Sequence, residues 1–220
     1  MSNCKKLLLL GAGGHCISVL DSVMETSEYD NIGIVDKSVS RTDTGNVSAY
    51  LQTFILGDDN ELPRLFSEGY THAFIAIGST GNTAIRRKMY YMLKEIGFII
   101  PNIIDKSAVV SKSVKLNDGI YIGKNAVVNA LSVIGSGAIV NTSCTVEHEC
   151  EIGDFVHISP GVTLCGNVCI DEDSHIGAGS VIKQGIHVGS NTMIGMGSVV
   201  LRDIGSGVTA YGSPCKEVKV

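Results

Sequence analysis

The second half of the chain repeats an aliphatic residue every six positions. From Ile104 to Val200 each sixth residue is Ile, Leu or Val, seventeen times without an exception. Neither the 3.6-residue period of a helix nor the 2-residue period of a strand produces a strict period of six. A solenoid with one short strand and one turn in every six residues does produce it, because each aliphatic side chain then points into the same prism. The pattern therefore predicts a triangular parallel β-helix, with three hexads in each coil.

Two further positions of the hexad also carry a preference. The residue four places after each aliphatic is nearly always small or β-branched, as at Ala126, Cys144 and Val162. The residue directly after the aliphatic is often Gly, Asn or Asp, as at Gly135 and Asn141. Because these residue types tolerate a left-handed backbone, we expect them to form the tight corners of the prism.

The first hundred residues alternate strand and helix patterns instead. Three apolar runs, at 7–10, 32–35 and 73–77, are typical of buried strands. Two periodic stretches, at 14–24 and 82–96, are typical of helices. This alternation indicates an α/β fold with a parallel sheet. We expect Arg86, Arg87 and Lys88 on the exposed side of the second helix. The predicted domains are a Rossmann-like half domain at 1–100 and the β-helix at 101–220.

Ligands of parallel α/β sheets bind beyond the carboxyl ends of the strands. In this chain those ends carry Gly13, Gly14, His15, Asp36, Lys37 and Gly78. A glycine turn that opens a helix suits a phosphate, because the free N–H groups and the helix dipole favour anions. Asp36 stands where a ribose-binding acid is expected, but Cys16 replaces the third glycine of the dinucleotide fingerprint. A half-sized domain therefore favours a nucleotide over a whole dinucleotide, and a plain turn without a ligand is the alternative.

Composition excludes several other classes of protein. The net charge is −5 and the pI is near 5.6, without a clustered basic stripe, which argues against a nucleic-acid partner. No apolar stretch approaches the length of a membrane span. The seven cysteines are odd in number and form no CxxC pair, so we expect reduced thiols in a cytoplasmic protein, with Cys144 and Cys150 in the core.

Polar residues that interrupt the repeat gather between Asn141 and His157. His148 is flanked there by Glu147 and Glu149, and since successive residues alternate faces, only one acid can easily reach the imidazole. A carboxylate on Nδ1–H fixes the tautomer and makes Nε2 more basic. His148 is therefore a candidate general base. A solvated turn histidine is the alternative.

Eight segments carry a further signal, and they span nearly the whole chain: 11–15, 36–37, 76–78, 141–143, 147–153, 157–161, 165–168 and 212–216. In residues and in order, these segments resemble the sugar O/N-acyltransferases of the NeuD/PglD type, a group of hexapeptide-repeat acetyltransferases. The resemblance implies a left-handed parallel β-helix that follows an α/β domain. It also implies acetyl-CoA as the cosubstrate, with no metal.

The resemblance further implies roles for individual residues. His148 would be the proton acceptor and Glu149 would raise its basicity. His157 would contact acetyl-CoA, and the backbone near Gly166 would hold the thioester oxyanion. Ala178 and Met196 fall where family members line the CoA groove, and the strand-end residues Gly13, Gly14, His15, Asp36, Lys37 and Gly78 would hold the nucleotide-sugar. Cys16 and Met196 depart from the usual residues of the family and affect selectivity.

The favoured function is acetylation of the amino group of a UDP-linked 4-amino-4,6-dideoxy sugar in bacterial glycan biosynthesis. O-acetylation of a sialic acid or capsular sugar is the alternative within the class. A metal hydrase of the γ-carbonic anhydrase kind would place Zn²⁺ on His148, His157 and His175 across a subunit boundary. A scaffold or sensor without catalysis is a third class. We expect a homotrimer, because CoA is long and needs a groove between packed prisms.

Overall fold

The computed structural model describes residues 5–39 and 48–218. The chain divides into two compact units. The first comprises the residues up to Gly78 together with Ile85–Ile103, and the second comprises Ser79–Ala84 together with the chain from Ile104 onward. A six-residue segment that lies, in the sequence, between a strand and a helix of the first unit thus belongs to the second unit.

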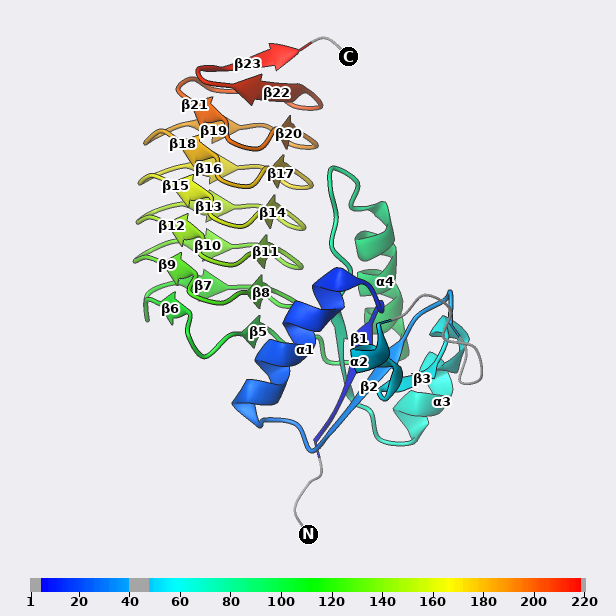
Figure 1. The fold of residues 1–220 in the computed structure, drawn as a ribbon. Coiled ribbons are helices and arrows are strands. Elements are labelled where there is room, and N and C mark those ends of the chain that lie inside the picture. Colours follow the sequence, from blue (N-terminus) through cyan, green and yellow to red (C-terminus); the bar gives the residue numbers. More distant parts are fainter. Residues whose placement is uncertain (1–4, 40–47, 219–220) are drawn as a thin grey trace. The chain divides into compact units, whose positions relative to one another are not determined.

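The first unit is a four-stranded parallel sheet with helices between its strands (Figure 1). Its elements are β1 (Lys6–Leu10), α1 (Gly14–Thr26), β2 (Asn31–Val35), α2 (Ala49–Gln52), β3 (Ile55–Gly57), the 3₁₀ turn η1 (Asp59–Glu61), α3 (Leu62–Ser67), β4 (His72–Ile75) and α4 (Ala84–Ile96). The strand order is β3-β2-β1-β4, so the leucine run of β1 lies between two neighbours and is buried on both faces. The predicted strands and helices are confirmed, whereas the short elements α2, β3, η1 and α3 were not predicted.

The prediction that Arg86 is exposed is wrong. Arg86 is only 3% exposed, Arg87 is half-buried and Lys88 is exposed. The reason is helical periodicity, because Arg86 precedes Met89, Tyr90 and Leu93 by three, four and seven residues and so shares their buried face. A basic run on a helix does not imply that every member faces water.

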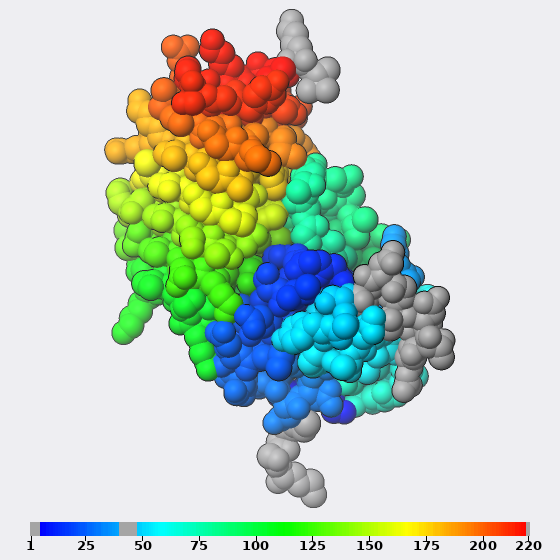
Figure 2. Space-filling view, in the orientation of Figure 1, coloured from blue at the N-terminus to red at the C-terminus, as the bar shows by residue number. Residues whose placement is uncertain are grey.

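The second unit is the left-handed parallel β-helix implied by the resemblance, and each hexad aliphatic from Ile104 to Val200 ends a two-residue strand. The strands are β5 (Ile103–Ile104), β6 (Val109–Val110), β7 (Lys115–Leu116), β8 (Tyr121–Ile122), β9 (Val127–Val128), β10 (Val133–Ile134), β11 (Ile139–Val140), β12 (Thr145–Val146), β13 (Glu151–Ile152), β14 (His157–Ile158), β15 (Thr163–Leu164), β16 (Cys169–Ile170), β17 (His175–Ile176), β18 (Val181–Ile182), β19 (His187–Val188), β20 (Met193–Ile194), β21 (Val199–Val200), β22 (Thr209–Gly212) and β23 (Cys215–Val218). In the space-filling view the coils follow one another as bands from green to red (Figure 2).

The strands form three ladders, which we name by their first strands. The β5 face is β5-β8-β11-β14-β17-β20, extended by β22 and β23; the β6 face is β6-β9-β12-β15-β18-β21; and the β7 face is β7-β10-β13-β16-β19. Neighbouring strands of a face are eighteen residues apart, as in the pairing of Cys169 with His187. The aliphatic residues and the small residues four places later fill the prism, and most are completely buried.

The structure corrects the assignment of the corner residues. The left-handed residue stands three places after the aliphatic, as at Asn125, Ser143 and Glu149, and not directly after it. The glycine directly after the aliphatic is needed for a different reason. A Cβ on Gly153 or Gly177 would lie 2.5 Å from a backbone nitrogen of the next coil. These glycines therefore permit close stacking of the coils, and Asn and Asp at the third position tolerate the turn.

The core thiols lie as predicted. Cys144 and Cys150 are completely buried and free, and burial raises the pKa of Cys144 to about 11. All six cysteines within the described residues are unbridged, and Cys4 lies outside them. None of the helices in the described ranges has the length and apolar character needed to cross a bilayer.

Candidate active site

The strongest candidate for chemistry is the pair His148 and Glu149, at the corner between the β6 and β7 faces. The Nδ1 atom of His148 lies 3.0 Å from Oε2 of Glu149, and both side chains are more than half exposed. Glu149 has the left-handed backbone of the corner, φ 59°, which turns its side chain back to the preceding histidine. Within the described residues Glu147 makes no ion pair with His148, so only one acid reaches the imidazole, as expected. A carboxylate on Nδ1–H leaves Nε2 as the basic atom.

Gly166 lies one coil beyond His148, directly against its ring. A Cβ at this position would lie 2.6 Å from both Cε1 and Nε2 of His148, so only glycine leaves room for the imidazole. The amide N–H of Asn167 donates to the carbonyl of His148 (2.9 Å) and fixes the two coils. No described residue accepts a hydrogen bond from the Gly166 amide. A basic nitrogen and an available N–H donor therefore lie side by side at this corner.

His157 and His175 lie elsewhere, on the β5 face. They are paired on neighbouring strands, each is 8% exposed, and their ring centroids are 4.9 Å apart. Nδ1 of His157 contacts the carbonyl oxygen of Ser79 at 2.7 Å, and its Nε2 contacts Nδ2 of Asn141 at 3.3 Å. Because a carbonyl can only accept, Nδ1 of His157 carries the proton and Nε2 accepts from the amide. That His157 contacts acetyl-CoA stays a prediction.

The contact with Ser79 is part of a larger anchorage of the segment 79–84 on the β-helix. The hydroxyl of Thr83 donates to the carboxylate of Asp173, and a Cβ on Gly81 would lie 2.5 Å from Cε of Met193. Gly81 also has a φ of +78°, which favours glycine. The sequence offered no signal for this anchorage, because its hydrogen bonds join residues that are 78 and 90 positions apart.

Ala178 and Met196 lie one coil apart at another corner, between the β5 and β6 faces. Both are exposed, and Met196 retains 81% of its accessible surface. The corner of His148 and Gly166 is on the opposite edge of the β6 face. A single chain therefore does not bring the predicted base and the predicted CoA-lining residues together.

In the first unit, the six predicted nucleotide-sugar residues line one cavity of about 540 Å³. They are Gly13, Gly14, His15, Asp36, Lys37 and Gly78. Gly13 caps α1 without a side-chain hydrogen bond, and a Cβ on Gly13 or Gly14 would meet nothing within 4 Å. Their amides lie at the start of a 13-residue helix, where the dipole favours an anion. Gly11 differs, since its φ of +102° and its contact with Ile77 make it necessary for the turn itself.

Asp36 supports the glycine turn. Its Oδ2 accepts from the Ala12 amide at 2.8 Å, and its Oδ1 accepts from the amide and hydroxyl of Ser38. Partial burial by itself raises the pKa of Asp36, but the bonds from Ser38 and Ala12 and the charge of Lys37 outweigh it, so the pKa is below its usual value. The carboxylate is therefore ionised at neutral pH, and it holds the turn in addition to any contact with a ligand.

His15 and Arg86 add an element that the sequence analysis missed. Burial, together with the smaller effect of the positive charge on Arg86, lowers the pKa of His15 to about 4, so the imidazole is neutral at pH 7. Arg86 is a buried cation near this cavity, and it was assigned to solvent. Arg86 shares the helical spacing of the buried residues Met89, Tyr90 and Leu93, and this spacing could have identified its side chain as buried.

The three histidines of the hydrase alternative do not come together in one chain. His157 and His175 are adjacent on the β5 face, whereas His148 is at a corner that the β5 face does not share. In the part of the chain that the structure describes, one group of three potential metal ligands was found, and it is Cys169, Asp171 and His187. None of the three proposed zinc histidines belongs to it.

Comparison with known proteins matches both units. Residues 6–93 match the PglD N-terminal domain, and residues 150–184 match the bacterial transferase hexapeptide (six repeats). A mutant of perosamine N-acetyltransferase from Caulobacter crescentus, in complex with CoA and GDP-perosamine, is 33% identical with a TM-score of 0.88. The alignment covers 98% of this chain and 97% of that one.

A second relative is the acetyltransferase domain of PglB from Neisseria gonorrhoeae, in complex with acetyl coenzyme A. It is 36% identical with a TM-score of 0.86, over 97% of this chain and 99% of that domain. WeeI from Acinetobacter baumannii, at 24% identity and a TM-score of 0.84, shares the fold over 97% of this chain and 100% of its own length. The whole two-unit architecture is therefore common to these proteins.

Proposed function

The chain belongs to the NeuD/PglD-type family of hexapeptide-repeat sugar acetyltransferases, and we propose that it transfers the acetyl group of acetyl-CoA to the amino group of a nucleotide-linked amino sugar. The observation that carries the proposal is the contact between the His148 ring and Gly166. It sets a general base beside an N–H donor, which are the two groups that acyl transfer from a thioester requires.

The reaction follows from these two groups. The amine attacks the thioester carbonyl while Nε2 of His148 takes its proton, so a carbon–nitrogen bond forms. The Gly166 amide donates to the carbonyl oxygen as negative charge develops there. The carbon–sulfur bond then breaks, and the proton on His148 is returned to the CoA thiolate. Glu149 keeps the imidazole oriented throughout, and no cysteine or covalent acyl-enzyme is needed.

We assign the nucleotide to the 540 Å³ cavity of the first unit. The amides of the glycine turn suit a diphosphate, and Asp36 and Lys37 suit hydroxyl groups of the ribose or sugar. UDP is the nucleotide we expect, with a 4-amino-4,6-dideoxy sugar attached. The Caulobacter relative is in complex with GDP-perosamine, so GDP is the nucleotide with which UDP should be compared in binding experiments. O-acetylation of a sialic acid or capsular sugar is the second candidate, but a free sugar has no diphosphate to place at the glycine turn.

Nucleotide binding is testable at Gly13. Because a Cβ there meets no protein atom, Gly13→Ala should leave the free energy of unfolding nearly unchanged and yet fill part of the cavity. We expect UDP to bind the wild type in titration calorimetry, with affinity reduced about tenfold or more by Gly13→Ala, which is about 1.4 kcal/mol. Asp36→Ala should also weaken binding, and NAD should bind neither variant nor wild type.

The matched control is Gly205→Ala, far from the cavity in the sequence, whose Cβ would make only one ordinary contact, 3.4 Å from Oε1 of Glu217. It should bind UDP as the wild type does. If GDP binds and UDP does not, the nucleobase in this proposal changes to guanine, and the proposed binding site stays the same. If neither nucleotide binds while free sialic acid is acetylated, the O-acetyltransferase alternative is correct, and tight NAD binding alone would favour a sensor.

We further propose a homotrimer in which the β6 faces pack around a three-fold axis. The first residues of the β6-face strands are all uncharged and β-branched, namely Val109, Val127, Thr145, Thr163, Val181 and Val199. Such packing would set the His148 corner of one copy beside the Ala178 and Met196 corner of the next. It would thereby form the CoA groove that one chain lacks. Free thiols suit the reducing cytoplasm, where we place the protein.

Light scattering tests the assembly, with a trimer expected at three times the 23.2 kDa chain mass. Val181 is 39% exposed on the β6 face, so Val181→Arg would bury an unpaired charge and should yield monomers. Val133 is the matched position on the β7 face, and Val133→Arg should remain trimeric. A monomeric wild type, or disruption by the Val133 variant only, would refute this interface.

A further inference from the structure

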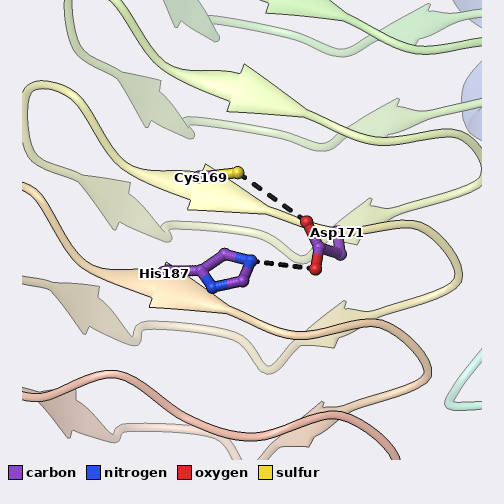
Figure 3. Close-up of side chains that lie close together, drawn as sticks. All are labelled: Cys169, Asp171 and His187. Atoms are coloured by element: carbon purple, nitrogen blue, oxygen red, sulfur yellow. Dashed lines mark hydrogen bonds and ion pairs between the residues drawn. The ribbon is translucent and has the colours of Figure 1, made fainter.

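Three side chains of different chemistry meet on the β7 face, which adjoins the His148 corner. Cys169 and Asp171 flank the buried Ile170, so both point outward from the prism, and His187 is paired with Cys169 one coil later. The close-up shows Asp171 turned toward both the thiol and the imidazole (Figure 3). Nothing in the acetyl transfer proposed above uses this group.

The distances within the group are close to those of a metal site. Nε2 of His187 lies 2.8 Å from Oδ2 of Asp171, and Sγ of Cys169 lies 3.7 Å from Oδ1. One atom from each of the three residues lies within 4.8 Å of the other two. Around a tetrahedral Zn²⁺ with Zn–S near 2.3 Å and Zn–N or Zn–O near 2.0 Å, ligand atoms are about 3.3–3.5 Å apart. Nε2 of His187 and Oδ2 of Asp171 would have to move apart by about half an ångström, and ligand atoms that now lie up to 4.8 Å apart would have to approach by at most about 1.3 Å.

The backbone that carries these side chains is already fixed. The amide of Cys169 donates to Ile186 at 3.0 Å and that of Asp171 donates to Val188 at 2.9 Å, so both residues are tied to the coil of His187. The amide of His187 donates to the Asp203 carboxylate at 2.9 Å. Because the ladder holds the ligand positions before any ion arrives, binding costs little reordering of the chain.

We propose that Cys169, Asp171 and His187 form a binding site for a divalent transition metal, with Zn²⁺ as the ion that fits best. Thiolate, imidazole and carboxylate together suit Zn²⁺ and its neighbours, whereas Mg²⁺ and Ca²⁺ require oxygen ligands. Cys169 and Asp171 also line a cavity of about 640 Å³, together with the acidic Glu151, Asp154 and Glu172. The cavity leaves room for water as the fourth ligand, and its acids favour a cation.

Cobalt(II) provides the direct test, because it takes the same ligands and reports them by its spectrum. Titration of the tag-free, full-length protein with Co²⁺ should produce a thiolate-to-cobalt charge-transfer band and intense visible bands of tetrahedral geometry, at one ion per chain. Added Zn²⁺ should abolish both. The Cys169 thiol loses its proton to solvent as the metal–sulfur bond forms.

Cys169→Ser should remove the charge-transfer band, and His187→Gln should lower Co²⁺ affinity by at least about tenfold. The matched control is Cys215→Ser, a half-buried free thiol in β23, which should keep the wild-type spectrum. If wild-type protein gives no thiolate band, or if the band survives Cys169→Ser, the three residues are an ordinary surface cluster and the proposal is wrong. Circular dichroism of each variant establishes that it is folded.

Discussion

Replacement of His148 by alanine should lower kcat by about 10²–10⁴-fold and leave the binding of both substrates nearly unchanged. Without the imidazole, the corner loses the nitrogen that would take the proton of the attacking amine, and Glu149 loses the ring that it orients through Nδ1. The side chain of His148 is 57% exposed, so the substitution creates no cavity and should cost little stability. Release of CoA from acetyl-CoA measures the rate.

The two acids beside His148 are a matched pair of controls. Glu149→Gln should lower kcat by less than His148→Ala does, since the glutamine side chain can still orient the ring but carries no negative charge. Glu147→Gln should leave kcat at the wild-type value, because its carboxylate makes no described ion pair with the ring. Wild-type turnover in both His148→Ala and Glu149→Gln would mean that the base is misassigned. An effect of Glu147→Gln equal to that of Glu149→Gln would contradict the orienting role.

Gly166→Ala should lower kcat about 100-fold although it adds only a methyl group. The new Cβ would lie 2.6 Å from Cε1 and Nε2 of His148, whereas an ordinary contact begins at 3.4 Å. The exposed imidazole can move away by roughly 1 Å at little cost in stability, but a displacement of that size in a reacting group can cost about 10²-fold in rate. We therefore expect a large fall in kcat with a small change in the melting temperature.

Gly205→Ala is the control for this prediction, because its Cβ meets only the end of a flexible side chain at 3.4 Å. It should retain wild-type kcat. Retention of full activity in Gly166→Ala would show that the ring position in the structure is not the one used in the reaction. A fall in kcat that accompanies unfolding of the variant in circular dichroism would contradict the proposed displacement of the ring.

The β-helix was predictable because one physical rule acts seventeen times. Each aliphatic from Ile104 to Val200 ends a strand, and the small residues four places later are buried. The corner rule was wrong, since Gly, Asn and Asp have two separate uses that sequence alone does not distinguish. Gly153 allows two coils to approach, whereas Asn125 adopts the left-handed backbone. Only the structure separates close approach from a positive φ.

The site residues illustrate which contacts a sequence can reveal. The pair His148 and Glu149 is local, so the sequence offered Glu147 and Glu149 as the two candidate acids, and the alternation of side chains predicted that only one of them reaches the ring. The strand ends of the first unit gather in one cavity because parallel strands share an edge. The hydrogen bond between His157 and the carbonyl of Ser79 joins residues far apart in the sequence, so no local sequence pattern predicted it. Cys169 and His187 are eighteen residues apart, one complete coil, so the repeat could have identified them as neighbours.

The eighteen-residue register also limits how this part of the molecule can change in length. Loss of one residue inside a strand would reverse the direction of every side chain that follows in that coil, turning residues such as Glu151 toward the core and Ile152 toward water. Loss of a whole coil would instead rejoin matching corners and preserve all three ladders. The β-helix can therefore lengthen or shorten only by complete turns, and any other insertion must bulge outward at a corner without entering the stack.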